Sequence, residues 1–422
     1  GAGFQVSPEK RDAILAACPE AIGKLPRYST GSDLTRKRDE RFAIDTFGLE
    51  LEALQRDYPP LYQHLNDYVR PERDQNADKG FRTYWWRMGR PRPELRLALK
   101  SLARYAVTTE VAKHRLFSWL EWPQDLIDGS VIAIAVDDAN HLGVLSSKVH
   151  EAWVLAAGGT LEDRPRYMTE ACFDPFPFPD ASAGPFAHIG TLAEHLDAHR
   201  KRQHAQHPDL TLTGMYNVLE KLRSGEPFTA KERVIHEHGL VSVLRQLHDD
   251  LDAAVLDAYG WSDLLPLLRI AHGNDALAEG HTRDDTKRAF DDAILERLVA
   301  LNSERAAEEA RGHIRWLRPE FQNPQATAAP QQAELDATSG EDEDTPAAIA
   351  PVSTKPIPWP KDTVEQVRAV AELLAASPVP LSLHEIEARF TSRGAWKKRL
   401  PQLLDMLVAL GRAQARESKW SA

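Results

Sequence analysis

The stretch Val131-Ile132-Ala133-Ile134-Ala135-Val136 is a continuous apolar run that lies between Asp128-Gly129 and Asp137-Asp138. Its length and its polar boundaries are typical of a buried strand. Two further strand candidates precede it, Arg104-Tyr105-Ala106-Val107-Thr108 and Arg115-Leu116-Phe117-Ser118-Trp119-Leu120. Helical periodicity follows over residues 142–155. Together these elements predict a mixed α/β domain.

The first 65 residues carry local signals for both helices and strands. Ser7 is suited to cap a helix that has Pro8 in its first position. The alternation over residues 41–45 indicates a strand. Residues 49–58 indicate a helix, which we expect Pro59-Pro60 to end.

Two features are expected after the sheet region. The stretch Phe173-Asp174-Pro175-Phe176-Pro177-Phe178-Pro179 is not compatible with a helix, because its prolines lack a donor and favour extended neighbours. We expect an extended strap whose aromatic rings dock on a neighbouring surface. Residues 187–318 are mainly helical in pattern, with one apolar face between Leu240 and Ala258 that Gly260 should end.

The last hundred residues divide into a linker and a small unit. Residues 322–360 are rich in Pro, Ala, Gln, Thr and acids, and this composition predicts disorder. Beyond them, helices are expected near residues 363–376 and 395–410. Ser382-Leu383-His384-Glu385 is a capping-box pattern for a short helix between these two, and the polar tail is suited to form a hairpin wing.

The predicted fold class is therefore α+β. The predicted division is a mixed α/β domain over residues 1–185, a helical domain over 186–321, a disordered Pro/acidic linker over 322–360 and a winged-helix-like domain over 361–422.

Composition narrows the class of protein. The chain has 422 residues, of which 42% are hydrophobic, so it has enough apolar material for real cores. No run approaches the ~18 apolar residues that a membrane span needs, and no secretory leader opens the chain. Cys18 and Cys172 are too few for a disulfide framework, so we expect a reducing, cytoplasmic setting.

The charge is distributed unevenly along the chain. The formal net charge is -11, which argues against a nucleic-acid partner when taken alone. Residues 70–115, however, contain twelve Lys and Arg against five acids, a local excess of +7 that leaves -18 on the remainder. A field of one sign concentrated in one segment says more about partners than the average does.

Arginines alternate with aromatic residues in this basic segment. Cations suit phosphates, forked donors suit guanine edges, and flat rings stack on exposed bases. The segment therefore favours contact with nucleic acid, and Lys113 and Arg115 beside a strand extend the pattern. The alternative is that the tryptophans belong to the core and the arginines form a solvated rim. The residues concerned are Arg82, Tyr84, Trp85, Trp86, Arg87, Arg90 and Arg92.

Other chemistries have weaker signals. His195 and His199 are four residues apart, but no glutamate follows the first of them as in a zincin, so a solvated or core-rim position is favoured over a metal site. Gly158-Gly159 lacks the further residues of a phosphate-binding loop. Asp137-Asp138 lacks the Glu-x-Lys of a metal nuclease, and the chain has no Gly-x-Ser-x-Gly elbow.

An ordered series of segments suggests a family. The series is Arg104-Tyr105-Ala106-Val107-Thr108, Ala112-Lys113-His114-Arg115-Leu116-Phe117, His150-Glu151-Ala152-Trp153 and Arg166-Tyr167-Met168-Thr169, followed by the strap. It resembles the C-terminal half of the large class I S-adenosylmethionine-dependent adenine-N6 DNA methyltransferases, which include single-chain restriction–modification enzymes and phage-defence methylases. Further segments fit the same family: Tyr28-Ser29-Thr30-Gly31-Ser32-Asp33-Leu34, Leu210-Thr211-Leu212-Thr213, Ala258-Tyr259-Gly260-Trp261 and Trp316-Leu317-Arg318-Pro319-Glu320-Phe321.

The chain departs from that family in one respect. The family's glycine-rich methyl-donor loop and its Asn/Asp-Pro-Pro-Tyr/Phe motif are missing, since Asp57-Tyr58-Pro59-Pro60-Leu61 has the wrong order. We therefore expect neither catalysis nor a cofactor in this segment; S-adenosylmethionine would bind to a catalytic domain on the same polypeptide or on a separate subunit. The abrupt start at Gly1-Ala2-Gly3-Phe4 favours a segment of a longer chain.

The resemblance implies a function in DNA target recognition, with double-stranded DNA and the methyltransferase catalytic domain as partners. The alternative is a module that docks a catalytic partner in a defence or restriction complex and touches DNA little. The expected DNA contacts are Arg82, Tyr84, Trp85, Trp86, Arg87, Arg90, Arg92, Lys113, Arg115, Lys397, Lys398 and Arg399.

Overall fold

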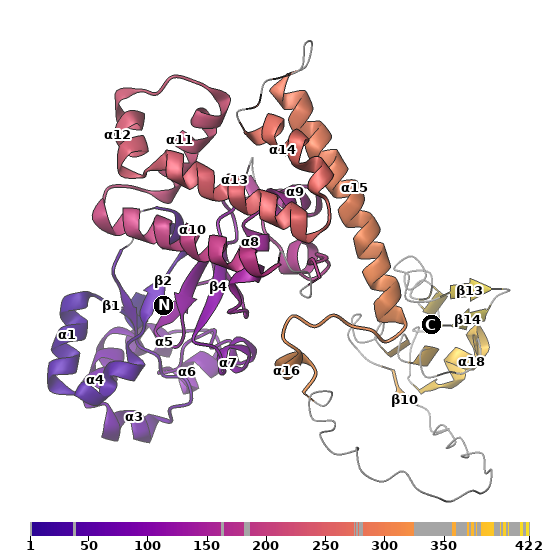
Figure 1. Ribbon diagram of the computed structural model, residues 1–422. Coiled ribbons are helices and arrows are strands. Elements are labelled where there is room, and N and C mark those ends of the chain that lie inside the picture. Colours follow the sequence, from indigo (N-terminus) through magenta and orange to yellow (C-terminus); the bar gives the residue numbers. More distant parts are fainter. Residues whose placement is uncertain are drawn as a thin grey trace, which may run out of the picture. The chain divides into compact units, whose positions relative to one another are not determined.

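The computed structural model describes residues 2–36, 39–161, 164–180, 186–273, 275, 277 and 282–324, together with short stretches between 357 and 421 (Figure 1). The chain divides into two compact units, residues 1–331 and 332–422, which are considered separately below. Within the described residues, no helix combines the length and the apolar character needed to cross a membrane.

Two small sheets lie at the centre of the first unit. The central strand of the first sheet is β4 (Arg104–Thr109), which pairs antiparallel with β5 (Ser118–Glu121) and β7 (Val131–Ile134). The three expected strands are present, although β5 begins three residues after Arg115 and β7 ends two residues before the apolar run does. The second sheet has the order β1 (Gln5–Val6), β3 (Phe42–Ala43), β2 (Arg27–Ser29) and β6 (Asp125–Ile127).

The N-terminal helices begin where the local signals predicted. The Ser7 side chain accepts a hydrogen bond from the backbone N–H of Lys10 and caps α1 (Pro8–Ala17). Helix α3 (Leu51–Asp57) ends before Pro59, as expected. The same prolines also begin α4 (Pro59–Tyr68), because the first turn of a helix needs no amide hydrogen from proline.

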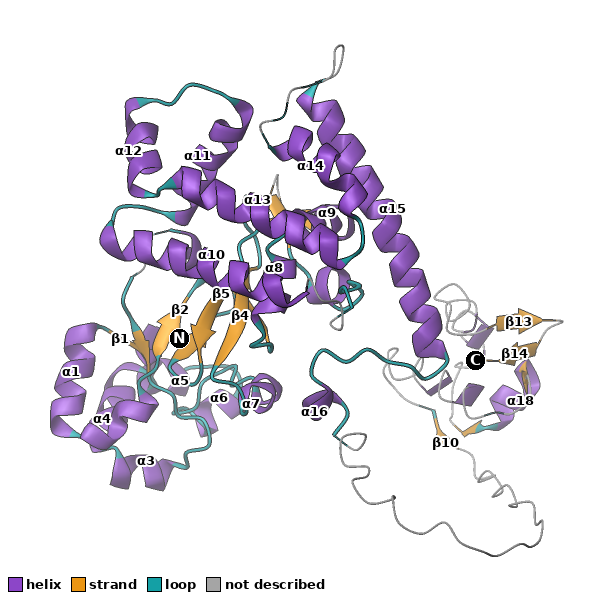
Figure 2. Ribbon diagram, in the orientation of Figure 1, coloured by secondary structure: helices purple, strands orange, loops and turns teal. Residues whose placement is uncertain are grey.

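Longer helices lie on the opposite side of the strands from the N-terminal helices α1, α3 and α4 (Figure 2). The helix α10 (Phe186–Gln206) packs against both α8 (Ala139–Leu145) and α13 (Val241–Ala258). A Cβ atom at Gly143 would lie 2.4 Å from the Cγ2 atom of Ile189, so only glycine permits this approach of α8 to α10. One hydrophobic core extends from Leu116 to Leu298 and includes residues on both sides of position 185.

The remaining elements of the first unit are short, apart from α15. They are η1 (Ala2–Phe4), η2 (Pro19–Lys24), α2 (Gly31–Thr35), α5 (Arg70–Asp74), α6 (Lys79–Thr83), α7 (Pro93–Leu99), α9 (Lys148–Ala157), β8 (Gly159–Leu161), β9 (Arg164–Arg166), η3 (Thr169–Phe173), α11 (Leu212–Ser224), α12 (Ala230–His238), η4 (Ser262–Leu264), α14 (Leu265–His272), α15 (Arg283–Ala310) and α16 (Pro319–Gln322).

The aromatic strap joins the sheet region to the helices. Phe173 still belongs to the π-helical turn η3, and the segment from Asp174 onward is irregular, as expected. The Phe176 ring is buried 4.4 Å from the His150 ring, and the Tyr259 hydroxyl donates to the carbonyl of Pro177 at 2.9 Å. The strap thus fastens α9 of the sheet region to α13 of the helical region.

The second unit is described only in part. Its described elements are β10 (Ile357–Pro358), β11 (Leu381–Ser382), α18 (Leu383–Ala388), β12 (Phe390–Thr391), β13 (Gln414–Arg416) and β14 (Lys419–Ser421). The Ser382 capping box is confirmed at the start of α18, and the polar tail forms an antiparallel pair of strands, β13 and β14. Most of the helices expected near residues 363–376 and 395–410 lie outside the described residues, so the winged-helix assignment stays a prediction.

Histidines contribute to the core of the first unit. Burial lowers the pKa of each of the following, because the charged form loses its hydration: His64, His141, His150, His199, His248 and His272. His199, one of the pair considered for metal binding, lies with its Nε2 atom 3.1 Å from the Gly239 carbonyl oxygen. Across the described part of the chain, no group of three or more His, Cys, Asp or Glu is arranged to hold a metal ion.

We expect acid to destabilise the first unit through His150. Burial lowers the pKa of His150 to about 3, whereas histidine in an unfolded chain has a pKa of ~6.5. Between these values only the unfolded state binds the proton, so the free energy of unfolding falls as the pH is lowered, by up to ~1.4 kcal/mol per pH unit. Urea titrations between about pH 7 and about pH 5 measure this slope.

A variant isolates the contribution of His150. The buried Asp252 carboxyl, whose pKa burial raises to about 7, acts in the opposite sense over the same range. The difference between wild type and His150→Gln is therefore the informative quantity. A slope that is equally steep in the variant would contradict the prediction.

Candidate nucleic-acid interface

Seven of the predicted DNA contacts, four of them arginines, lie on one segment, which runs from α6 through an irregular stretch to α7. The Asp78 carboxylate accepts from the amide of Gly80 and begins α6. Two prolines, Pro91 and Pro93, prevent a continuous helix after Arg90. Arg87 and Arg90 therefore lie in an irregular stretch, whereas Arg82 lies in the last turn of α6 and Arg92 is the N-cap residue of α7.

Three of these arginines, Arg82, Arg87 and Arg90, differ in the partners of their side chains. Arg82 is exposed and donates to the carbonyl oxygens of Asn76 and Ala77, at 2.5 and 2.9 Å. Arg87 forms an exposed ion pair of 2.7 Å with Glu50. Arg90 is exposed and forms no hydrogen bond or ion pair with the part of the chain that the structure describes. Exposed ion pairs contribute little to stability, so Arg87 can exchange Glu50 for a phosphate. Arg90 has no such pair to break among the described residues and is available directly.

The aromatic residues of the segment separate into two groups. Trp85 and Trp86 are only 5% and 6% exposed and belong to the core beneath α3 and α4. The indole N–H of Trp86 donates to the Leu49 carbonyl at 3.0 Å, and the Thr46 hydroxyl donates to the carbonyl of Trp86 at 2.7 Å. Both rings therefore anchor the segment, and the stacking role expected for them is corrected. Tyr84 remains exposed, with the Arg87 guanidinium 4.6 Å from its ring centroid.

Lys113 and Arg115 are held by other elements. The Lys113 ammonium lies 3.0 Å from the Glu220 carboxylate on α11, on the surface. Arg115 is covered, and its guanidinium donates to the carbonyl oxygens of Thr109 and Pro165. Burial lowers the pKa of Arg115 to about 10. Its donors are used internally, so the expectation that Arg115 contacts DNA is corrected; it fixes the turn after β4 instead.

The second unit contributes one described residue of the predicted set. The Lys397 ammonium lies 3.1 Å from the Glu387 carboxylate. Lys398 and Arg399 lie outside the described residues.

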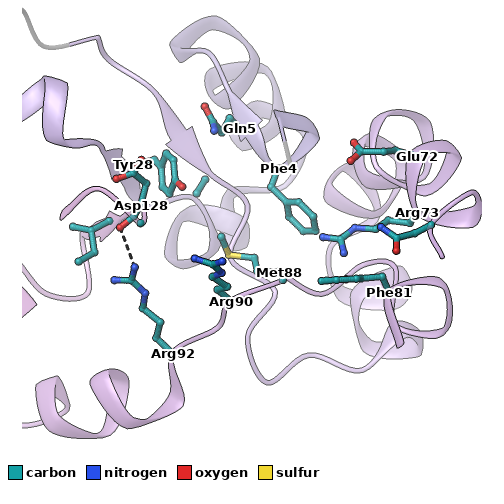
Figure 3. Close-up of a pocket in the computed structure, with 15 residues that line it drawn as sticks. Phe4, Gln5, Tyr28, Glu72, Arg73, Phe81, Met88, Arg90, Arg92 and Asp128 are labelled. Atoms are coloured by element: carbon teal, nitrogen blue, oxygen red, sulfur yellow. Dashed lines mark hydrogen bonds between the residues drawn. The ribbon is translucent and has the colours of Figure 1, made fainter. Parts of the chain in front are cut away.

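A cavity of about 420 Å³ lies beside the arginine segment (Figure 3). Arg73, Arg90 and Arg92 border it, and Phe4, Phe81 and Met88 supply apolar walls. Tyr28, Glu72 and Asp128 add polar groups, and burial raises the pKa of the Tyr28 hydroxyl. The cavity is thus bordered by three guanidinium groups and two carboxylates.

Arg73 lies in the basic segment, but it is not among the DNA contacts predicted from the sequence. The signal that could have found it is the charge on α5 facing aromatic residues of α6, since Phe81 follows eight residues later. Phe4 and Asp128 had no such signal, because the second sheet brings β1 and the end of β6 to the cavity.

The comparison with known families addresses the same part of the chain. Residues 3–180 match the family model of the MmeI target recognition domain. This match confirms the family resemblance for that segment, which contains the arginine segment, the cavity and the strap. The matched segment covers less than half of the 422-residue chain.

Among solved structures, the chain is similar to the type IIL restriction-modification enzyme MmeI, whose structure was solved in complex with DNA. The sequences are 16% identical and the TM-score is 0.45; the similarity covers 70% of this chain and 34% of that protein. The chain thus spans about a third of that protein's length. A search of curated proteins found no match.

Proposed function

We propose that this chain supplies DNA target recognition for an adenine-N6 DNA methyltransferase of a restriction–modification or phage-defence system. The observation that carries the proposal is the match of residues 3–180 to a target recognition domain. In this proposal the methyltransferase catalytic domain, with its S-adenosylmethionine, lies outside these 422 residues, either on the same polypeptide or on a separate subunit. No methyl transfer is expected from the chain alone.

The arrangement of the arginine segment supports this function. Trp85 and Trp86 are buried and hold the segment on a rigid core, while Arg82 and Arg90 point to solvent. Fixed cations of this kind place a protein on the phosphates, and base edges are then read in a groove. Selecting one adenine for extrusion costs a few kcal/mol of unstacking, which contacts to the surrounding duplex must offset.

Salt dependence of DNA binding tests the proposal. If Arg82 and Arg87 each neutralise one phosphate and Arg90 and Arg92 share a third, the logarithm of the association constant should fall with the logarithm of salt with a slope near -2.7, at ~0.9 per phosphate. Fluorescence anisotropy of a labelled duplex with the 422-residue chain measures this slope. Weak binding with a flat salt dependence would instead favour a module that docks a catalytic partner.

A further inference from the structure

We propose that the cavity bordered by Arg73, Arg90 and Arg92 binds one phosphate group of the DNA backbone, with Arg73 as its fixed ligand. The proposal rests on the DNA-binding function proposed above and adds to it a site and a residue that the sequence reasoning did not select. Three observations on the cavity carry it.

The first observation is the state of Arg73. Its side chain is 6% exposed, yet it forms no hydrogen bond or ion pair with any described residue. Its guanidinium carbon lies 4.2 Å from the ring centroid of Phe81 and 5.7 Å from that of Phe4. A buried cation without an acceptor is costly, whereas the same group is already in place for an incoming anion.

The second observation is how the site keeps this geometry. Figure 3 shows the Arg73 guanidinium ending beside the rings of Phe4 and Phe81. A Cβ atom at Gly89 would lie 3.0 Å from the Phe81 ring and 3.8 Å from the Arg73 Nη2 atom. The absence of a side chain at Gly89 therefore leaves room for both the ring and the guanidinium.

The third observation concerns the two other arginines. Arg92 has a left-handed backbone with φ of 49°, and its guanidinium donates to the Asp128 carbonyl at 3.1 Å. Such strained positions are concentrated at ligand sites. Arg90 is exposed, has no partner among the described residues, and borders the cavity between Arg73 and Arg92 (Figure 3).

The charge balance favours a phosphate over a base edge. Three guanidinium groups border the cavity against two carboxylates, and Asp128 already accepts from the amide and hydroxyl of Ser130, at 2.9 and 2.6 Å. Glu72 is exposed, so water screens its charge. A backbone phosphate offsets the remaining positive charge, and its two non-bridging oxygens can accept from the guanidinium groups. A guanine edge is neutral and would leave the like charges uncompensated.

The test compares two substitutions at Arg73 in the full chain. Arg73→Met keeps an unbranched chain between the two rings but removes the charge, and Arg73→Lys keeps the charge but removes the fork. We expect Arg73→Met to reduce the salt slope for a labelled duplex by about 0.9, and Arg73→Lys to keep the wild-type slope with weaker binding. Arg56→Gln is the matched control, since Arg56 is an exposed arginine paired with Asp57 outside the cavity.

The outcomes separate the two proposals. If wild type shows no salt-dependent binding, the proposed function fails and the phosphate site fails with it. If wild type binds and a folded Arg73→Met retains the full slope, the phosphate site alone is overturned. If Arg73→Met retains the wild-type slope but selects a different preferred sequence from a random duplex pool than wild type does, the cavity reads a base. This outcome also overturns the phosphate assignment.

Arg90→Gln provides a second test that does not depend on the stability of Arg73 variants. Arg90 is exposed, so its replacement should leave the melting temperature unchanged. The site predicts a slope reduction of about 0.9 for this variant as well. If Arg73→Met does not fold and Arg90→Gln retains the wild-type slope, the phosphate site is overturned.

Discussion

Replacing Arg82, Arg87 and Arg90 together by glutamine is expected to weaken binding to duplex DNA by roughly 10³-fold at low salt. Hydrogen bonds to charged groups contribute ~1.5 kcal/mol each, and three of them correspond to about three decades in the dissociation constant. The salt slope should fall by about 2.7 for the same three contacts. Anisotropy titrations with the full chain measure both quantities.

A triple variant of equal charge serves as the control. Arg56, Arg288 and Arg297 lie on α3 and α15, outside the arginine segment, and each forms an ion pair on the surface. Their combined replacement by glutamine changes the net charge by the same amount and should shift the affinity far less. Equal losses in the two triple variants would show that only the overall charge matters, and would exclude the arginine segment as the interface.

Phe176→Ala is expected to lower the free energy of unfolding of the first unit by ~3–5 kcal/mol, because it empties a large buried site. The Phe176 ring packs 4.4 Å from His150, 5.1 Å from Phe178 and 6.1 Å from Trp153, measured between ring centroids. Neighbours that are themselves held in the core cannot close such a cavity. Urea denaturation at neutral pH measures the loss.

Phe47→Ala is the matched control for the strap. Phe47 is 42% exposed, so its removal creates no cavity and should cost ~1 kcal/mol or less, mostly from its contact with Arg96. A loss below ~1 kcal/mol for Phe176→Ala would contradict the fastening role of the strap.

Local patterns were sufficient for several elements. The strands β4 and β7, the Ser7 cap and the Ser382 capping box all depend on residues within a few positions of one another, and all are confirmed. The double role of Pro59-Pro60 was missed, because the same residues both end one helix and begin the next.

The candidate site was predicted only in part, since residue type does not reveal which side chains become covered. Trp85 and Trp86 have the same composition-based signal as Tyr84, yet only Tyr84 stays exposed. Arg115 and Arg90 are both arginines of the basic segment. Arg115 is captured by the Pro165 carbonyl, fifty residues further along the chain, and Arg90 is not.

The sequence by itself determined the mixed α+β class, the concentration of positive charge in residues 70–115 and the resemblance to a target recognition domain. These properties depend on composition and on neighbours along the chain. The tertiary structure alone decided that Phe4, Arg73 and Asp128 border one cavity, and that Arg73 lies there without an acceptor among the residues that the structure describes. The reason is physical: burial and backbone partners come from packing between distant segments, which no local pattern specifies.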